Sequence, residues 1–323
     1  MICRICGNEE NNTEYDVKEM MYGTKELFPY FQCEKCGCLQ ITKIPSEISK
    51  YYPDDYYSYS EVNTGAINEY GKLKSYMVNL RNRYAAFGRG IIGKLICKKY
   101  PTDKFKGITK LRLNKNSTIL DVGCGAGVFL SACCEQGFTN ILGIDPFNSD
   151  DIEYQKGLKI LKKEIYDIDG EWDLITFHHS FEHVPDQLKI LQHTYEILKP
   201  GGYCMIRVPT ISSYAWDYYK VNWVQLDAPR HFYLHSLESI KILANKIGME
   251  LTDFVYDSTS FQFWGSEQYL KNIPLCDENS YAKNPEKSMF SKNDILAFAK
   301  QAKSLNIENQ GDQVIFYLRK PFK

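Results

Sequence analysis

The stretch Ile119-Leu120-Asp121-Val122-Gly123-Cys124-Gly125-Ala126-Gly127 decides the fold of this chain. Its first residues are mainly apolar and β-branched, as in a strand covered on both faces, and the apolar residues that follow at 128–132 begin a helical pattern. The three glycines lie at the bend, where glycine adopts positive φ and lets backbones approach closely. The stretch therefore predicts a strand, a glycine loop and a helix, as at the start of an α/β domain.

The spacing of this loop predicts a nucleoside ligand without phosphates. The glycines follow the pattern G-x-G-x-G and Asp121 stands just before them, whereas loops that bring a helix N-terminus to a pyrophosphate follow G-x-G-x-x-G. Asp145 ends the next apolar segment, about 20 residues after the loop, where a carboxylate can accept both ribose hydroxyls. We therefore expect Asp121 and Asp145 to bind the nucleoside.

Four ordered motifs resemble those of the class I S-adenosylmethionine-dependent methyltransferases. They are DVGCGAG at 121–127, GIDP at 143–146, FEHVPD at 181–186 and LKPGG at 198–202. The resemblance covers about residues 116–249 and implies that Gly123 and Gly125 pass beneath the methionine part of the cofactor, while Asp145 binds its ribose. It also implies further cofactor contacts, at Asp121, Cys124, Gly127, Pro146, His179 and Phe181. The alternative is a Rossmann-like scaffold without a ligand.

Composition and charge indicate a globular protein that acts on a small molecule. The 323 residues are 44% hydrophobic and 14% aromatic, which is enough for one large domain or a medium domain with attachments. The formal net charge is −1, without blocks of like charge, so a nucleic-acid partner is unlikely. No apolar run has membrane-spanning length and no signal segment is recognisable. The sequence thus predicts a cytoplasmic protein without a membrane partner and leaves its oligomeric state open.

Two C-x-x-C-G motifs near the N-terminus predict a metal site. They contain Cys3 and Cys6, then Cys33 and Cys36. The long interval between the pairs is typical of a zinc ribbon, in which two hairpins contribute four thiolates to one tetrahedral ion. Cys38 is an alternative ligand, but the repeated spacing favours Cys36. Because four thiolates leave no open coordination position, we expect the zinc to be structural.

A Tyr-rich linker and a helical cap are predicted between ribbon and core. Residues 51–59 contain five tyrosines around a Pro-Asp turn. They indicate either a surface turn that packs on a neighbouring domain, or a lid over the cofactor cleft with one phenol hydrogen-bonded to the substrate. Apolar residues at helical spacing from 70 to 100 predict helices interrupted at Gly88 and Gly90. We expect a ribbon at 1–45, the linker and cap at 46–110, and the methyltransferase domain at 111–323.

Alternating strands and helices from residue 116 onward predict a Rossmann-like, doubly wound α/β sheet of seven strands. The expected strands are 119–122, 140–144, 158–161, 172–177, 203–208, 249–256 and 313–318, the last antiparallel by the resemblance. The polar segment at about 261–309 is expected to be a helical insertion.

Two histidine clusters follow strand ends, where open α/β sheets bind ligands. The first contains Glu182 and His183; the resemblance to methyltransferases implies that this Glu-His pair braces its loop, so His183 is alternatively a structural residue. The second contains His231 among aromatic residues, although His231 is alternatively a core residue. Imidazole titrates near neutral pH, so His231 or His183 is the candidate base. For carbon methylation, Tyr56 or Tyr57 would stabilise the enolate oxygen.

The combination of cysteine ribbon, Tyr-rich segment and second cluster is similar to zinc-containing sugar C-methyltransferases and to methyltransferases of polysaccharide and natural-product pathways. Those sugar enzymes carry Glu-His where this chain has Arg230-His231. The resemblance implies methyl transfer from S-adenosylmethionine to a sugar or nucleotide-sugar. The alternatives are O-methylation of a phenolic or quinone-like metabolite, RNA methylation, and binding of the cofactor without catalysis.

Overall fold

The computed structural model describes residues 1–52, 72–154 and 157–322, which form two compact units. The first unit comprises Met1–Pro53, His179–Gln192 and Ile206–Leu318, and the second comprises Asp54–His178, His193–Met205 and Arg319–Lys323. Each unit is thus assembled from segments far apart in the sequence. The division into three consecutive domains stays a prediction.

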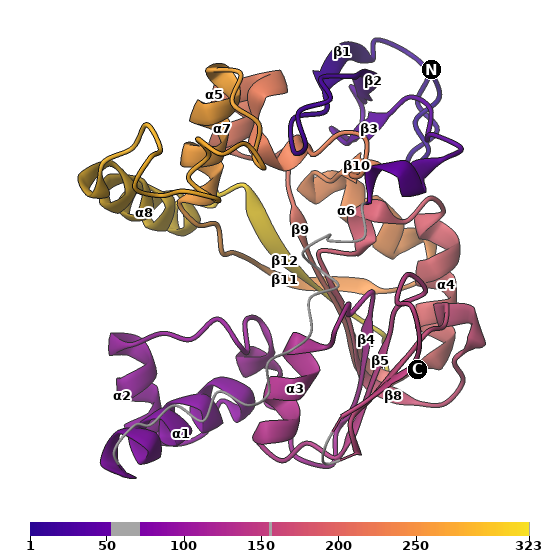
Figure 1. The fold of residues 1–323 in the computed structure, drawn as a ribbon. Helices are drawn as coiled ribbons and strands as arrows, with labels where there is room; N and C mark the ends of the chain where they lie inside the picture. Colours follow the sequence, from indigo (N-terminus) through magenta and orange to yellow (C-terminus); the bar gives the residue numbers. More distant parts are fainter. Residues whose placement is uncertain (53–71, 155–156, 323) are drawn as a thin grey trace. The chain divides into compact units, whose positions relative to one another are not determined.

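The first unit contains a small sheet that joins the N-terminal segment to a strand from far along the chain (Figure 1). Its order is β1-β2-β3-β10, with β1 at Thr13–Lys18, β2 at Leu27–Gln32, β3 at Leu39–Ile41 and β10 at Tyr233–Leu234. All three pairings are antiparallel, and Tyr233 lies opposite Gln40. The fourth strand therefore begins two positions after His231.

The second unit contains a mainly parallel sheet with the strand order β8-β4-β5-β7-β6. The strands are β4 at Thr118–Val122, β5 at Asn140–Ile144, β6 at Ile152–Glu153, β7 at Lys159–Leu161 and β8 at Trp172–His178. β4 pairs in parallel with β5 and β8, and β5 with β7, whereas β6 is antiparallel to β7. Ile119, Leu120 and Ile175 have no exposed surface, as expected for strands covered on both faces.

The residues of β9 (Leu198–Pro209) are divided between the two units. In the sheet, β9 is followed by β12 (Gln313–Arg319) and then by β11 (Glu250–Tyr256), in the order β11-β12-β9. The sheet has eight strands among the described residues instead of the predicted seven. The additional strand is the two-residue β6, which pairs with β7 and forms one edge of the sheet. β9 also begins five residues earlier than predicted. The reason is that Gly201 and Gly202 exchange backbone hydrogen bonds with Lys320, so the Pro-Gly-Gly turn signal lies within a paired strand.

The helices largely follow the predicted pattern. They are α1 (Lys72–Phe87), α2 (Ile91–Lys99), α3 (Val128–Glu135), α4 (Gln187–Ile197), α5 (Tyr214–Tyr219), α6 (Leu237–Lys246), α7 (Phe261–Leu270) and α8 (Lys292–Ile307). The predicted break between α1 and α2 is confirmed at Gly88 and Gly90, both at positive φ. A Cβ on Gly93 would lie 2.4 Å from the Leu80 carbonyl oxygen, so glycine allows α2 to lie against α1. The predicted insertion is helical at α7 and α8.

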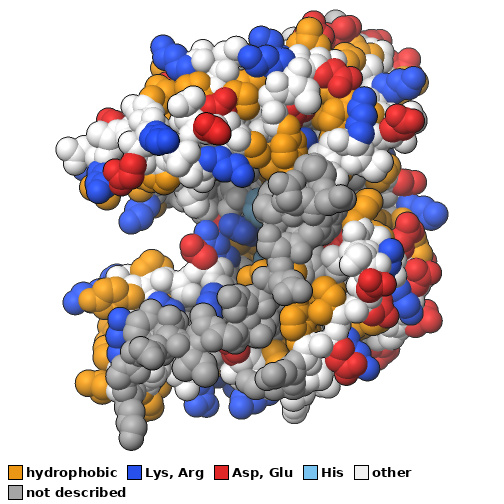
Figure 2. Space-filling view, viewed as in Figure 1, with side chains coloured by type: hydrophobic (Ala, Val, Ile, Leu, Met, Phe, Trp, Pro, Cys, Tyr) orange, Lys and Arg blue, Asp and Glu red, His pale blue; other side chains and the backbone are white. Residues whose placement is uncertain are grey.

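Charged side chains of both signs are interspersed on the face drawn in Figure 2. This distribution agrees with the formal net charge of −1. Among the described residues, none of the helices has the length and apolar character needed to cross a membrane.

Candidate functional site

The loop between β4 and α3, in the second unit, has the positive-φ backbone that its glycines predict. Gly123, Gly125 and Gly127 have φ values of 69°, 52° and 78°, which residues with a Cβ rarely adopt. A Cβ on Gly127 would also lie 2.6 Å from Cδ1 of Ile160. The Gly123 N–H donates to the Ile144 carbonyl at 2.8 Å, so the loop is attached to the neighbouring strand β5.

The two predicted carboxylates lie beside this loop and are buried. Asp121 accepts a hydrogen bond from the Thr176 hydroxyl at 2.7 Å. Asp145 accepts one from the Gly125 N–H at 2.8 Å and one from the Phe147 N–H at 2.9 Å. Burial raises the pKa of Asp121 to about 7, with a smaller contribution from the charge of Asp145. Because it accepts these two backbone hydrogen bonds, Asp145 also holds the loop in place. The sequence did not indicate this structural role.

These contacts are compatible with a bound nucleoside. A carboxylate offers about four lone-pair sites, so backbone donors and ribose hydroxyls can share Asp145, and its ribose-binding role stays a prediction. Cys124 and Pro146 are partly buried in the same two loops. Sequence reasoning missed two side chains that hold the loop: Asn148 donates to the Gly125 carbonyl at 3.1 Å and Tyr154 to the Ala126 carbonyl at 2.8 Å. Neither belongs to a periodic pattern or motif that would have identified it.

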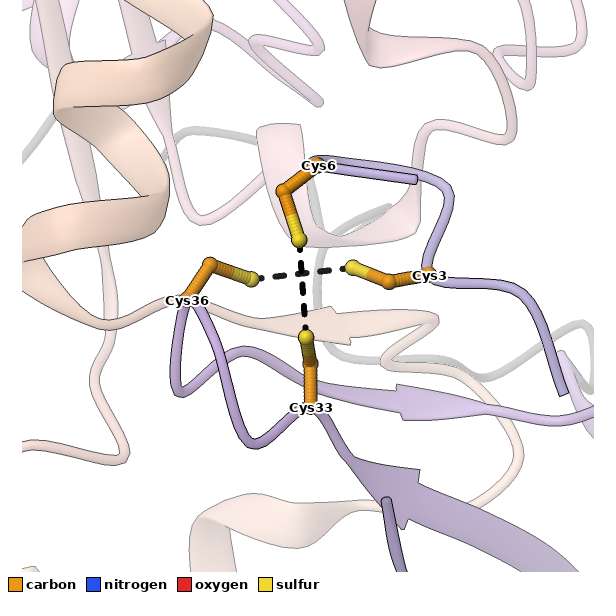
Figure 3. A group of neighbouring side chains, drawn as sticks. All are labelled: Cys3, Cys6, Cys33 and Cys36. Carbon is orange, nitrogen blue, oxygen red and sulfur yellow. Dashed lines mark hydrogen bonds between the residues drawn. The ribbon is translucent and has the colours of Figure 1, made fainter. Parts of the chain in front are cut away.

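Four cysteine thiols converge in the first unit, as Figure 3 shows. The Sγ atoms of Cys3 and Cys36 are 3.6 Å apart, those of Cys6 and Cys33 are 3.5 Å apart, and all four lie within 4.8 Å of one another. Sulfurs placed about 2.3 Å from a tetrahedral zinc ion would be separated by about 3.8 Å. The predicted ligands are therefore brought together at distances that fit zinc.

The surroundings of the cluster also suit metal binding. A hydrogen bond from Cys36 lowers the pKa of the Cys3 thiol, which favours the thiolate that binds metals. The Gln40 side-chain amide lies 3.2 Å from the same sulfur and can donate to it. Cys38, the alternative ligand, instead directs its thiol to the Leu39 carbonyl at 3.6 Å.

The two candidate bases lie side by side in the first unit, with ring centroids 4.8 Å apart. Nδ1 of His183 lies 2.8 Å from the Arg230 carbonyl oxygen, and Nδ1 of His231 lies 2.8 Å from that of Gln225. Because a carbonyl oxygen only accepts, both Nδ1 atoms carry the proton, and in each neutral ring Nε2 keeps the lone pair. Each imidazole is thus in the tautomer that can take a proton at Nε2.

Two carboxylates face Nε2 of His231. Oε1 of Glu182 lies 3.9 Å away and Oδ2 of Asp227 lies 3.8 Å away. Burial opposes ionisation of Glu182, but the neighbouring imidazoles, His179 foremost, lower its pKa to about 2. Burial likewise opposes ionisation of Asp227, and the charge of Arg230 lowers its pKa. Both carboxylates thus lie beside the nitrogen at which His231 would accept a proton.

His183 is a less suitable base. Burial, followed by the charge of His231, lowers the pKa of His183, so the ring favours the neutral form. The Tyr52 hydroxyl lies 3.1 Å from its Nδ1. Tyr56 and Tyr57, the predicted enolate-stabilising phenols, lie outside the described residues; the Tyr-rich segment reaches the histidine pair through Tyr52, which the sequence analysis did not single out.

Other predicted residues of the first unit have structural contacts. Phe181 is fully buried and stacks on His235 at a centroid distance of 5.6 Å. His179 has a positive φ of 52° and its Nδ1 lies 3.5 Å from Glu182 Oε1. The backbone carbonyl of Glu182 accepts a hydrogen bond from the Phe232 N–H, and the expected bracing role of Glu182 stays a prediction. Cofactor contacts of Phe181 and His179 stay predictions.

Arg230, the residue before the candidate base His231, is engaged in internal contacts. It is fully buried and its guanidinium contacts the carboxylates of Glu19, at 3.0 Å, and Asp227, with Nε 3.0 Å from both oxygens. It also donates to the Tyr51 carbonyl at 3.2 Å. Arg230 is therefore an internal ion-pair residue of this unit.

Comparison with known proteins agrees with the motifs. Residues 98–253 match the family described as "Methyltransferase domain". This part of the chain, 156 of the 323 residues, resembles a methyltransferase domain. The matched residues include the glycine loop, both loop carboxylates and both candidate bases, and the match agrees with the expected S-adenosylmethionine-dependent class and cofactor.

Individual relatives are similar over parts of their length. The ubiquinone biosynthesis O-methyltransferase of Hydrogenovibrio crunogenus is 32% identical over 100 residues, which cover 28% of this chain and 41% of that protein. The enzyme of the same name from Pseudomonas aeruginosa is 28% identical over 95 residues, which cover 26% of this chain and 40% of that protein. The chain thus spans about two fifths of the length of these curated relatives. The cyclopropane synthase MmaA2 from Mycobacterium tuberculosis has a TM-score of 0.41 and 17% identity, covering 64% of this chain and 79% of that one.

Proposed function

We propose that the protein transfers a methyl group from S-adenosylmethionine to a small-molecule acceptor and that His231 accepts the proton which the acceptor loses. The observation that carries the proposal is the setting of His231 Nε2: the Gln225 carbonyl holds the proton on Nδ1, while Glu182 and Asp227 lie within 4 Å of Nε2. An imidazole held in this tautomer has its lone pair on Nε2, where it can accept a proton from the acceptor.

The bound cofactor supplies an activated methyl group on a sulfonium ion. Methyl transfer is an in-line displacement, so the protein mainly aligns the reactants and excludes water. In this proposal the backbone of Gly123 and Gly125 lies beneath the methionine part and Asp145 accepts the ribose hydroxyls. Asp121 is held by Thr176 and supports the same loop.

A sugar or nucleotide-sugar is the acceptor that we favour. The support is the resemblance to zinc-containing sugar C-methyltransferases, together with four cysteine thiols at distances that fit zinc. For methylation beside a carbonyl, His231 would remove the proton from carbon, and a phenol of the Tyr-rich segment, Tyr56 or Tyr57, would stabilise the enolate oxygen.

A phenolic or quinone-like acceptor is the second candidate. It is favoured by the name of the curated relatives, ubiquinone biosynthesis O-methyltransferase. In that reaction His231 would remove a hydroxyl proton, and the methyl group would be found on oxygen. The cytoplasmic location predicted from the sequence suits both acceptors.

The decisive experiment measures transfer of a labelled methyl group to a panel of nucleotide-activated keto sugars and phenols, and locates the label by NMR. We expect His231→Ala to lower kcat by about 100- to 10,000-fold, as loss of a general base does. His193→Gln is the matched control, because His193 contacts the Ile168 carbonyl outside the proposed site. Both variants should bind S-adenosylmethionine as the wild type does, measured by calorimetry.

Two results would contradict the proposal. Full turnover by His231→Ala would reject His231 as the base. Cofactor binding without turnover on any acceptor would instead favour a binding protein that performs no catalysis.

A further inference from the structure

The residues around His231 belong to the same sheet as the cysteine ribbon. β10 begins at Tyr233 and pairs with β3, which follows Cys36 by three residues. The pairing extends toward the histidine, because the Ile41 N–H donates to the Phe232 carbonyl at 3.0 Å. The backbone immediately after His231 is therefore an edge of the ribbon sheet.

His231 itself receives a hydrogen bond from the ribbon. The hydroxyl of Tyr30, on β2, donates to the His231 carbonyl oxygen at 2.8 Å. Tyr30 is fully buried, and burial raises the pKa of its phenol well above the usual value, so the hydroxyl keeps the proton that it donates. Tyr30 lies three residues before Cys33, in the strand that leads into the second pair of cysteines.

Contacts on both sides of His231 extend this attachment. Before it, Arg230 pairs with Glu19, which follows β1 directly, at 3.0 Å. After it, the hydroxyl of Ser236 donates to the carbonyl oxygen of Cys36. Residues 230–236 are thus held at four points, at Arg230, His231, Phe232 and Ser236, by residues that lie in or beside the cysteine hairpins.

We propose that the zinc ribbon positions the catalytic base, with Tyr30 as a positioning residue that acts through the backbone of His231. The metal would hold Cys33 and Cys36 together and so fix β2 and β3, and these strands hold the backbone from which the imidazole projects. Nδ1 is bonded to Gln225, so a displaced backbone would redirect Nε2. The inference rests on the proposed function, in which His231 is the base.

Tyr30→Phe tests the inference because it removes a single hydroxyl. The matched control is Tyr15→Phe: Tyr15 lies directly opposite Tyr30 in the β1–β2 pairing, but its hydroxyl contacts Gln32. We expect Tyr30→Phe to lower kcat by up to about 100-fold, as small displacements of catalytic groups do. It should change the pH profile of kcat and leave the KM for S-adenosylmethionine unchanged. Tyr15→Phe should behave as the wild type.

A second measurement does not depend on turnover. The imidazole nitrogen resonances of His231, assigned with His231→Gln, should shift in Tyr30→Phe and after zinc is removed with a chelator, and should stay in place in Tyr15→Phe. Zinc content reports whether each variant keeps a folded ribbon. If Tyr30→Phe loses its zinc, Glu19→Gln probes the same loop through Arg230 and should produce the same shift.

The outcomes separate this inference from the proposed function. An active wild type, combined with unchanged kcat and unchanged His231 resonances in Tyr30→Phe and Glu19→Gln, would overturn the positioning role alone. A wild type without turnover on any acceptor would reject the proposed function, and the resonances would then still report whether the ribbon holds His231. Equal shifts in Tyr30→Phe and Tyr15→Phe would also overturn the inference, since a general disturbance of the sheet would explain them.

Discussion

Replacing Arg230 with Met tests how strongly the buried ion pairs stabilise the first unit. The guanidinium has no exposed surface and contacts Glu19 and Asp227. Met is apolar and of similar length, so the main loss is that of charge pairing. Removing one partner of a buried pair costs about 3–5 kcal/mol in free energy of unfolding, because the remaining charge is left buried.

The two carboxylates do not share this cost equally. Glu19 also accepts hydrogen bonds from the backbone of Tyr22 and from the backbone and hydroxyl of Thr24, at 2.9 to 3.2 Å. Asp227 loses both of its contacts with Nε of Arg230. We therefore expect a loss near the lower end of the range, about 3 kcal/mol, with most of it at Asp227.

Urea denaturation followed by circular dichroism measures this loss. Lys241→Met is the matched control: it removes an ion pair with Glu238 at 3.9 Å in which both side chains are about half exposed, and such pairs contribute about 0–1 kcal/mol. Arg230→Met combined with Asp227→Asn should recover part of the loss. A cost below about 1 kcal/mol for Arg230→Met, equal to that of the control, would refute the reasoning.

The remaining predictions concern the loop carboxylates and the cysteines. The pKa of Asp121 is raised to about 7 from the ordinary value of 3.8. The folded protein therefore keeps this carboxyl protonated where the unfolded chain loses the proton, and the free energy of unfolding falls as pH rises between these two values. Asp121→Asn should therefore gain more unfolding free energy relative to the wild type at pH 8 than at pH 5, and parallel pH curves in denaturant titrations would count against this. Asp145→Asn should weaken S-adenosylmethionine binding by about tenfold or more, as loss of hydrogen bonds to a charged group does, whereas calorimetry on the exposed-site control Asp169→Asn should give the wild-type Kd. Cys6→Ser should lose the zinc found by metal analysis, while Cys97→Ser should retain it; equal zinc in both would exclude the four-cysteine site.

The glycine loop and the cysteine cluster could be predicted because each depends on residues close together in the sequence. Positive φ at Gly123, Gly125 and Gly127 follows from the need to turn from a strand into a helix. The C-x-x-C spacing likewise directs two thiols to one point before any long-range contact forms. Local patterns of this kind can be recognised from the amino-acid sequence without a structure.

The environment of His231 could not be predicted in the same way. β10 has two residues, too few for a period of alternation, and its partner β3 lies near the other end of the chain. The ion pair of Arg230 with Glu19 joins the same two distant segments, so the sequence around Arg230 did not indicate it. Such contacts arise only when distant segments meet, and no local propensity encodes them.

The late arrival of β10 has a consequence for biosynthesis. Tyr30 and His231 are separated by 201 positions, which a ribosome translates in about 10–40 s. During this interval the nascent N-terminal hairpins present β3 as an open edge, a template for mispairing with other chains. Early metal binding by the four thiols would shorten the time for which this segment remains unfolded and prone to aggregation.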